Sequence, residues 1–273
     1  MTENHDVSAW NELLSRIQCL GRLTLAYSGG IDSRFLAHAA LQARVPVEMV
    51  HISGPHVAPA ETRFALDWAS AQGLEVTVLR LDPLVLPEVA AGGRERCYAC
   101  KRFLFEQIMC VAGAKVCDGS NASDAALFRP GLRAVRELGV VSPLAESGLS
   151  KDAIRSLARS TGLARPDQQA RACLLTRLPY GMFPDPCLLA RLAEGERVVE
   201  DALRRAGHAN QSFRLRVCES GGHELHLGPG IHSADVFRVL EEALQAAGFP
   251  CTPVRSMDSV SGYFDKKHGA RGS

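Results

Sequence analysis

The stretch from Leu23 to His38, LTLAYSGGIDSRFLAH, decides which fold the first half of the chain is expected to adopt. The apolar run from Leu23 to Tyr27 predicts a buried strand of a parallel sheet. Ser28-Gly29-Gly30 predicts a sharp turn, and Asp32 or Ser33 is expected to N-cap the helix that follows. A strand, a glycine-rich loop and a helix N-terminus in this order form an anion site, because backbone N–H groups converge there and the helix dipole favours negative charge.

The loop differs from two common nucleotide-binding motifs, since GxxxxGK[ST] and GxGxxG are both absent. Its six residues from Ser28 to Ser33, SGGIDS, resemble the SGGxDS loop of the PP-loop ATP pyrophosphatases. In that superfamily the loop holds the pyrophosphate end of ATP, and the products are an adenylated substrate and pyrophosphate. The alternative is a tight glycine turn with a capping serine and no ligand.

The composition is that of a soluble globular protein. The chain has 273 residues, of which 46% are apolar. Its net charge is +1, so it lacks the excess of positive charge that attracts nucleic acid or an anionic membrane. No apolar run is long enough to span a membrane, and the acidic N-terminus differs from a secretory signal. We therefore expect a cytoplasmic protein with no nucleic-acid or membrane partner, whose nine cysteines are thiols or metal ligands rather than disulfides.

Strands alternate with helices along the first part of the chain, which predicts an α/β fold with a parallel sheet and helices on both faces. Near the C-terminus, a helix followed by a β-β-α-β pattern predicts a small α+β domain. The expected domains are residues 1–165, which bind ATP, and residues 187–264, which bind substrate or support oligomerisation. An active-site linker at 166–186 carries Cys173, and a disordered tail is expected at 265–273.

Cys97 and Cys100 form a CxxC motif at the start of a predicted helix. The helix dipole favours thiolates there, as do the neighbouring cations Arg94, Arg96 and Lys101. By itself the motif leaves metal ligation, redox chemistry and an inert role open. Cys173 lies apart in the Pro-rich linker between two arginines, Arg171 and Arg177, which predicts a depressed pKa and a reactive thiol.

Several polar residues are candidates for binding an anion. Asp118 opens a polar loop at the same sheet edge as the glycine-rich loop. Arg129 and Arg133 suit phosphate or carboxylate, or alternatively surface ion pairs. Arg214 and Arg216 alternate onto one face of a predicted strand, where they either clamp an anion or belong to an exposed polar face.

Six separated motifs occur in order along the chain. Together they resemble the LarE-type sulfur transferases of the PP-loop superfamily, and the resemblance extends from Leu23 to Gly181. The resemblance implies that ATP and Mg²⁺ are used to adenylate a carboxylate of a pyridinium biscarboxylate mononucleotide. Sulfur then displaces AMP, and the thiocarboxylate product serves assembly of a nickel-pincer nucleotide cofactor. The motifs are SGGIDS, CYACK, DGSNASD, RPGLRAVRELGVVSPL, GLSK and ACLLTRLPYG.

The resemblance also implies which residues form the site. Arg214 and Arg216, with Glu200 nearby, resemble the pair that binds the substrate phosphate close to a subunit interface in a homo-oligomer, expected to be a hexamer. The expected catalytic residues are Asp32, Lys101 and Cys173. The expected binding residues are Ser28, Gly29, Gly30, Asp32, Ser33, Asp118, Arg129, Arg133, Arg214 and Arg216.

Members of the family differ in the source of the sulfur. Some sacrifice the sulfur of the cysteine in the ACL motif and are left with dehydroalanine, whereas others bind a [4Fe-4S] cluster through three thiolates and use sulfide or another sulfur donor. Cys97, Cys100 and Cys173 make this chain resemble the cluster-bearing type, with one iron left open. Zinc at the same thiolates and a sacrificial Cys173 are the alternatives.

Two other functions compete with this interpretation. PP-loop tRNA thiolases also combine this loop with cysteines or clusters, but the balanced charge and the lack of a basic extension argue against RNA. A non-catalytic iron–sulfur or zinc-binding protein is the other, and the intact SGGIDS loop argues against it.

Overall fold

This computed structural model describes residues 2–124, 130–169 and 171–269, with side chains from residue 7 to residue 267. The chain divides into two compact units, and the division is discontinuous in sequence. The first unit comprises Met1–Gly54, Glu61–Val89 and Glu95–Gln168. The second unit comprises Pro55–Ala60, Ala90–Arg94 and Gln169–Ser273.

The sheet of the first unit has four parallel strands in the order β3-β2-β1-β4. Leu25 of β1 lies opposite Met49 of β2 and Cys117 of β4. The chain therefore moves outward from β1 in opposite directions, and such a switch point is where parallel sheets bind ligands. The strands are β1 (Leu23–Ala26), β2 (Val47–Ser53), β3 (Val76–Arg80) and β4 (Lys115–Cys117).

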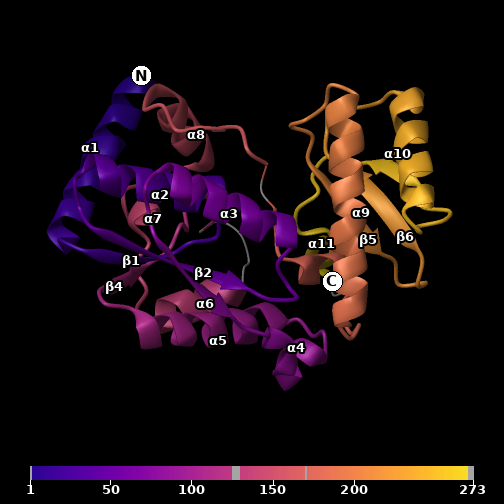
Figure 1. Cartoon of the computed structure of the whole chain (residues 1–273), viewed down its shortest axis with the longest axis horizontal. Helices are drawn as coiled ribbons and strands as arrows, with labels where there is room; N and C mark the ends of the chain where they lie inside the picture. The colour runs from indigo at the N-terminus through magenta and orange to yellow at the C-terminus, as the bar shows by residue number, and fades with distance from the viewer. Residues whose placement is uncertain (1, 125–129, 170, 270–273) are drawn as a thin grey trace. The chain divides into compact units, whose positions relative to one another are not determined.

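Helices cover both faces of this sheet, so the predicted α/β fold is confirmed (Figure 1). On one face are α1 (Thr2–Leu20), α2 (Ile31–Gln42), α3 (Pro59–Ala71), α7 (Pro143–Glu146) and α8 (Lys151–Ser160). On the other are α5 (Arg96–Val111) and α6 (Pro130–Glu137). The remaining short helices of this part are η1 (Pro83–Val85), α4 (Pro87–Ala90) and η2 (Ala122–Asp124).

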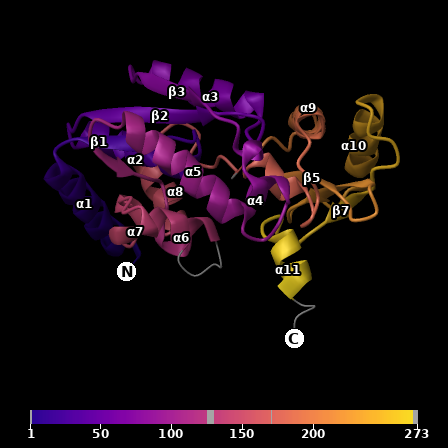
Figure 2. The same cartoon turned by 90° about the horizontal axis from the view of Figure 1, so that it is seen from below.

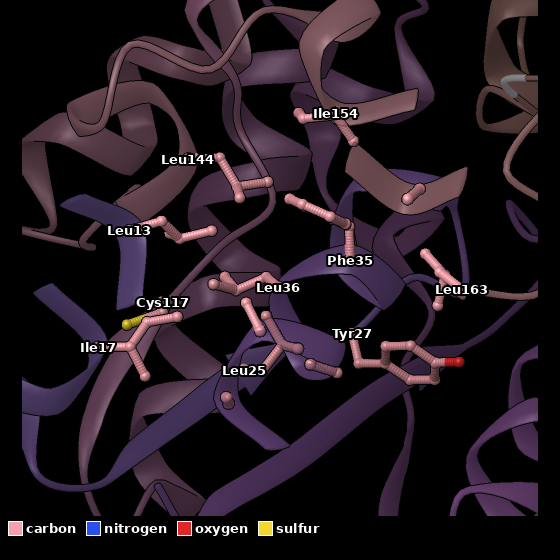
Figure 3. Packing of buried hydrophobic residues seen from close by; sticks show 14 of the residues in the cluster. Leu13, Ile17, Leu25, Tyr27, Phe35, Leu36, Cys117, Leu144, Ile154 and Leu163 are labelled. Carbon is pink, nitrogen blue, oxygen red and sulfur yellow. The ribbon is translucent and has the colours of Figure 1, made fainter. Parts of the chain in front are cut away.

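The larger hydrophobic core lies between β1 and the helices of the first face. Leu25 points from the strand toward Leu36 of α2 and Ile17 of α1, as Figure 3 shows, and all three side chains are fully buried. Burial of each such side chain contributes about 1.5–3 kcal/mol. This packing fixes α2 over β1, and thereby fixes the loop that joins them.

The second unit contains a three-stranded sheet in the order β5-β6-β7. β5 (Phe213–Val217) and β6 (His223–Leu227) form the predicted antiparallel hairpin, and β7 (Val254–Ser256) is parallel to β6. Helices α9 (Pro186–Arg205) and α10 (Ala234–Ala246) lie side by side against this sheet (Figures 1 and 2). The predicted small α+β fold is therefore confirmed. A short helix, η3 (Leu174–Arg177), precedes α9.

Two local predictions are wrong. Helix α2 begins at Ile31 with Gly30 as its N-cap, so Asp32 and Ser33 lie inside the first turn rather than at the cap. The extended backbone of Gly30, with φ −68° and ψ 164°, already provides the cap geometry. The tail predicted as disordered from residue 265 overlaps α11 (Tyr263–Gly269), in which Phe264 is buried.

Among the described residues, the helices are all too short or too polar to cross a membrane.

We expect Gly195→Ala to destabilise the second unit. A Cβ at Gly195 of α9 would lie 2.5 Å from Cδ2 of Leu215 and 2.7 Å from Cε2 of Phe249. Such overpacking costs about 1–3 kcal/mol, against the roughly 1 kcal/mol that alanine gains in a helix. Urea unfolding should show lower stability than in Gly222→Ala, where a Cβ meets nothing within 4 Å. Equal or higher stability of Gly195→Ala would contradict this packing.

Candidate functional site

The glycine-rich loop follows β1 at its carboxyl end and is held by close packing. Gly29 has φ +77°, and a Cβ there would lie 2.6 Å from the Cβ of Ala65 in α3, so only glycine fits. The hydroxyl oxygens of Ser28 and Ser33 are 3.1 Å apart, and Ser33 also donates to the Gly30 carbonyl at 3.1 Å. These contacts close the loop onto the first turn of α2.

The N-terminus of α2 is left without a side-chain cap. Gly30 at the N-cap has no side chain, and the first helical bond runs from the Arg34 N–H to the Gly30 carbonyl at 3.0 Å. The N–H groups of Ile31, Asp32 and Ser33 precede that bond and have no partner within the helix. Three donors and the positive end of the helix dipole therefore lie together, as an anion site requires.

Asp32 lies in the first turn of α2 and is partly buried. Its Oδ1 atom is buried and accepts no hydrogen bond from the described residues. Burial raises the pKa of this carboxyl; the Lys151 charge and a hydrogen bond from the Asn121 side chain oppose the rise, and the Asp124 charge adds to it. A buried carboxylate oxygen without a donor fits a cation or a donor supplied by a ligand.

Asp118 follows β4 and is buried, as expected for a residue at this sheet edge. Its carboxylate accepts hydrogen bonds from the hydroxyls of Ser120 at 2.6 Å and Ser142 at 2.7 Å, and from the Ser120 N–H at 3.1 Å. The Lys101 ammonium is 3.9 Å from Oδ2. Asp118 thus organises the loop around it, and its predicted contact with the nucleotide stays a prediction.

Gly119 and Lys151 are two site residues that sequence reasoning did not single out. A Cβ at Gly119 would lie 2.9 Å from the backbone nitrogen of Ser33, so the loop after β4 passes directly against the start of α2. Lys151 begins α8 and acts electrostatically on Asp32. Both belong to motifs quoted above, DGSNASD and GLSK, but only the fold brings them to the glycine-rich loop.

Arg133 forms surface ion pairs, which is one of the two alternatives considered for it. Its guanidinium is 2.5 Å from Oε2 of Glu95, and its Cζ lies 4.0 Å from the ring centroid of Tyr98. The side chain is about half exposed. Arg129, the second arginine of this motif, lies outside the described residues.

Cys97 and Cys100 lie in the first turns of α5, three residues apart, so both thiols project from one side of the helix. Cys100 is buried and Cys97 is half-buried. Gly131 of α6 packs on this turn, since a Cβ there would lie 3.0 Å from Cδ of Lys101 and 3.4 Å from the Cys97 carbonyl oxygen. Within either unit, the described residues contain no group of three His, Cys, Asp or Glu side chains that could hold a metal ion.

Cys173 belongs to the second unit, where it is the N-cap of η3. The backbone around it is held by Arg177, whose side chain is almost completely buried. Arg177 forms a bidentate pair with Glu196 of α9, with both N–O distances 2.8 Å. Its remaining nitrogen donates to the carbonyls of Ala172 at 2.9 Å and Cys173 at 3.3 Å. This clamp ties the cysteine-bearing segment to α9.

Both arginines that flank Cys173 in sequence are therefore ion-paired. Arg177 pairs with Glu196, and Arg171 pairs with Glu200 one helical turn further along α9. Because each positive charge is already compensated, the charges that were expected to stabilise a Cys173 thiolate are partly used elsewhere. The depressed pKa of Cys173 stays a prediction.

Arg214 and Arg216 lie on β5 and are both buried, so the exposed polar face considered for this strand is wrong. Burial, followed by repulsion from Arg177, lowers the pKa of Arg214 to about 9 and of Arg216 to about 10. Arg216 also donates to the Thr176 carbonyl at 2.6 Å. Three buried guanidiniums thus act on each other next to Glu196, and the charge of Asp265 also acts on Arg216.

Comparison with known proteins gives three relatives, whereas no family model matches the chain. It is 32% identical over 201 residues to the uncharacterized protein slr1717 of a Synechocystis strain, covering 71% of this chain and 69% of that protein. It is 31% identical over 203 residues to the uncharacterized protein MJ0830 of Methanocaldococcus jannaschii, covering 72% of this chain and 77% of that protein.

The third relative has a named activity. Pyridinium-3,5-bisthiocarboxylic acid mononucleotide synthase of Lactiplantibacillus plantarum is 30% identical over 175 residues. That similarity covers 62% of this chain and 63% of the relative, which is less than two thirds of its length.

We expect Glu196→Gln to lower the free energy of unfolding by about 3–5 kcal/mol, because the amide leaves the buried Arg177 charge unpaired. Burial raises the pKa of Glu196, but the Arg177 charge and its hydrogen bonds outweigh burial and hold that pKa below its usual range. The contribution of a carboxylate with a lowered pKa is present above its unfolded pKa and is lost as the pH falls through its folded pKa. The stability difference between the two proteins should therefore shrink below about pH 4.

The control is Glu194→Gln on the same helix, where the carboxylate pairs with Arg197 in an exposed position. Urea unfolding at several pH values should show little change for this variant. A Glu196→Gln protein as stable as the control at neutral pH would show that the clamp does not stabilise the fold.

Proposed function

This chain belongs to one family with slr1717 of Synechocystis and MJ0830 of Methanocaldococcus jannaschii, and we propose that it is an ATP-dependent sulfur transferase of the LarE type. The observation that carries the proposal is the SGGIDS loop, which combines an uncapped helix N-terminus with the buried, unpartnered Oδ1 of Asp32. The similarity to a pyridinium-3,5-bisthiocarboxylic acid mononucleotide synthase supports the class of substrate.

ATP would bind with its β- and γ-phosphates against the first turn of α2. The N–H groups of Ile31, Asp32 and Ser33 would donate to phosphate oxygens, and the hydroxyls of Ser28 and Ser33 line the same loop. The chemistry of Asp32 fits Mg²⁺, because a carboxylate oxygen is a preferred ligand of this ion and Oδ1 has no other partner among the described residues.

The reaction that we propose has two steps. A carboxylate oxygen of the substrate attacks the α-phosphorus of ATP, and the bond to the pyrophosphate oxygen breaks. A sulfur nucleophile then attacks the carboxyl carbon of the acyl adenylate, and AMP leaves with the bond electrons. In both steps the protein places charged groups rather than reacting covalently, so positioning by the loop accounts for most of its contribution.

The cluster of buried guanidiniums in the second unit supports a site for the phosphate of the mononucleotide. Arg214 and Arg216 are buried beside Arg177, and an anion there would relieve the repulsion among the three guanidiniums. Planar guanidinium groups suit bidentate contacts with phosphate. As part of the same proposal, the active form is a homo-oligomer, a hexamer by resemblance.

For sulfur delivery we propose the three-thiolate arrangement of Cys97, Cys100 and Cys173. The donor set is chemically suited to an iron–sulfur cluster, since two thiols share one side of α5 and soft thiolates select such clusters or zinc. A [4Fe-4S] cluster held by three thiolates leaves one iron able to carry the sulfide that is transferred. Lys101, 3.9 Å from Asp118, would add positive charge next to the nucleotide.

We expect Asp32→Ala and Ser28→Ala to lose substrate-dependent pyrophosphate release by roughly hundredfold or more, since each removes a group held at the loop. Pyrophosphate release and circular dichroism should be measured together to show that the variants stay folded. Ser15→Ala, at an exposed position of α1, is the matched control and should keep full activity. Full activity in both loop variants would remove the assignment of ATP to this loop.

We also expect protein purified without oxygen to be brown and to contain iron and acid-labile sulfide. Changing any one of Cys97, Cys100 and Cys173 to alanine should abolish both, whereas Cys19→Ala at an exposed site of α1 should not. With sulfide supplied, turnover should repeat at unchanged polypeptide mass. Colourless protein that turns over once and carries dehydroalanine at position 173 would instead establish the sacrificial route.

A further inference from the structure

Arg34 is a completely buried cation on α2, directly after the glycine-rich loop. Its Nε donates to the Gly29 carbonyl at 3.2 Å, and its two terminal nitrogens donate to the Ala164 carbonyl at 2.7 Å and the Arg165 carbonyl at 3.2 Å. One of them also donates to the side-chain oxygen of Gln168. One guanidinium therefore joins the loop to the last residues of the first unit.

Aromatic rings complete the surroundings of this guanidinium. Its Cζ lies 5.3 Å from the ring centroid of Phe64 and 5.6 Å from that of Trp68, both on α3. Burial lowers the pKa of Arg34 to about 10, so the group is still charged at neutral pH. A charge held by carbonyl oxygens and ring faces is confined to one position, because any displacement breaks several contacts together.

The bond to Gly29 has a direct consequence for the loop. The Gly29 carbonyl and the Gly30 N–H belong to the same planar trans peptide, so they point in opposite directions. With its carbonyl held by the buried Arg34, this peptide turns the Gly30 N–H to the opposite side, where it donates to Ser28 Oγ at 3.3 Å. Without this restraint, glycines on both sides of the peptide bond would allow it to rotate.

We propose that Arg34 is a positioning residue that locks the Gly29–Gly30 peptide plane, so that the glycine-rich loop, with its Gly30 N–H bonded to Ser28 Oγ, has its ATP-binding shape before ATP binds. The effect on ATP rests on the proposed function, whereas the lock itself does not. An exposed Arg or Lys of a phosphate site would contact the ligand directly, but Arg34 is enclosed and acts through the backbone. Substitution of Arg34 should therefore alter the dynamics of the loop without removing a side chain that contacts ATP.

The terminal nitrogens of Arg34 also hold the backbone near the C-terminal end of the first unit. Arg165 has φ +54°, an unusual conformation for a residue with a side chain, and its carbonyl is one of the Arg34 acceptors. Its own guanidinium lies 5.0 Å from the Phe64 ring. The loop and the segment that leads toward Cys173 are thus held by one side chain.

The test compares Arg34→Lys and Arg34→Gln with two controls in the full-length protein. Lysine keeps the charge but loses the planar fork, so it should not restore the wild-type behaviour. In ligand-free protein, amide hydrogen exchange of residues 28–32 should be at least about tenfold faster in both variants. The dissociation constant of ATP, measured by calorimetry, should rise at least about tenfold.

The controls separate the lock from stability and from the other contacts of Arg34. Phe35→Leu weakens the same core without touching the loop, and Gln168→Ala removes one acceptor while leaving Gly29 in place. Both should keep ATP affinity within about twofold of wild type. Wild-type exchange at residues 28–32 in the Arg34 variants, or equal acceleration in Phe35→Leu, would overturn the lock. If wild-type protein fails to bind ATP, the proposed function is wrong, and the exchange rates still decide the role of Arg34.

Discussion

The first unit depends on how closely three backbone segments approach one another at the carboxyl end of β1. Gly29 leaves no space for a Cβ against Ala65, and Gly119 leaves none against the nitrogen of Ser33. The glycine-rich loop, α3 and the loop after β4 are therefore in direct contact, with no side chain able to intervene. A loop packed in this way has lost most of its conformational freedom before any ligand arrives, so binding costs less ordering entropy.

The second unit is organised by a different constraint, the balance of buried charge. Glu196 forms a bidentate pair with the buried Arg177. Its Oε1 atom, which accepts from Nε of Arg177, also accepts from the Leu215 N–H at 3.0 Å. One carboxylate thus connects α9, β5 and the segment of Cys173. Buried ion pairs rarely add net stability compared with apolar side chains, but removing one partner of such a pair is costly because it leaves the other charge buried.

Much of this arrangement could be predicted from the sequence because short local patterns determine it. The apolar run before Ser28 and the alternation of strands and helices were sufficient for the parallel sheet. What could not be predicted depends on tertiary contacts. No local pattern shows that Arg34 is buried, or that Arg133 pairs with Glu95. The helix at Tyr263–Gly269 was not predicted, because burial of Phe264 is a tertiary contact that the polar composition of the tail does not show.

The discontinuous division of the chain affects how the two units can fold and be separated. The chain passes between the units five times, since Pro55–Ala60 and Ala90–Arg94 group with the C-terminal part. These short segments are anchored there by backbone hydrogen bonds, from the Leu174 N–H to the His56 carbonyl at 2.9 Å and from the Gly181 N–H to the Gly92 carbonyl at 3.1 Å. No single cut of the polypeptide yields two complete units. During synthesis, the first two segments of the second unit are made before the rest of that unit. The second unit therefore cannot be produced from one continuous segment of the chain, and a fragment that begins after Gln168 would lack Pro55–Ala60 and Ala90–Arg94.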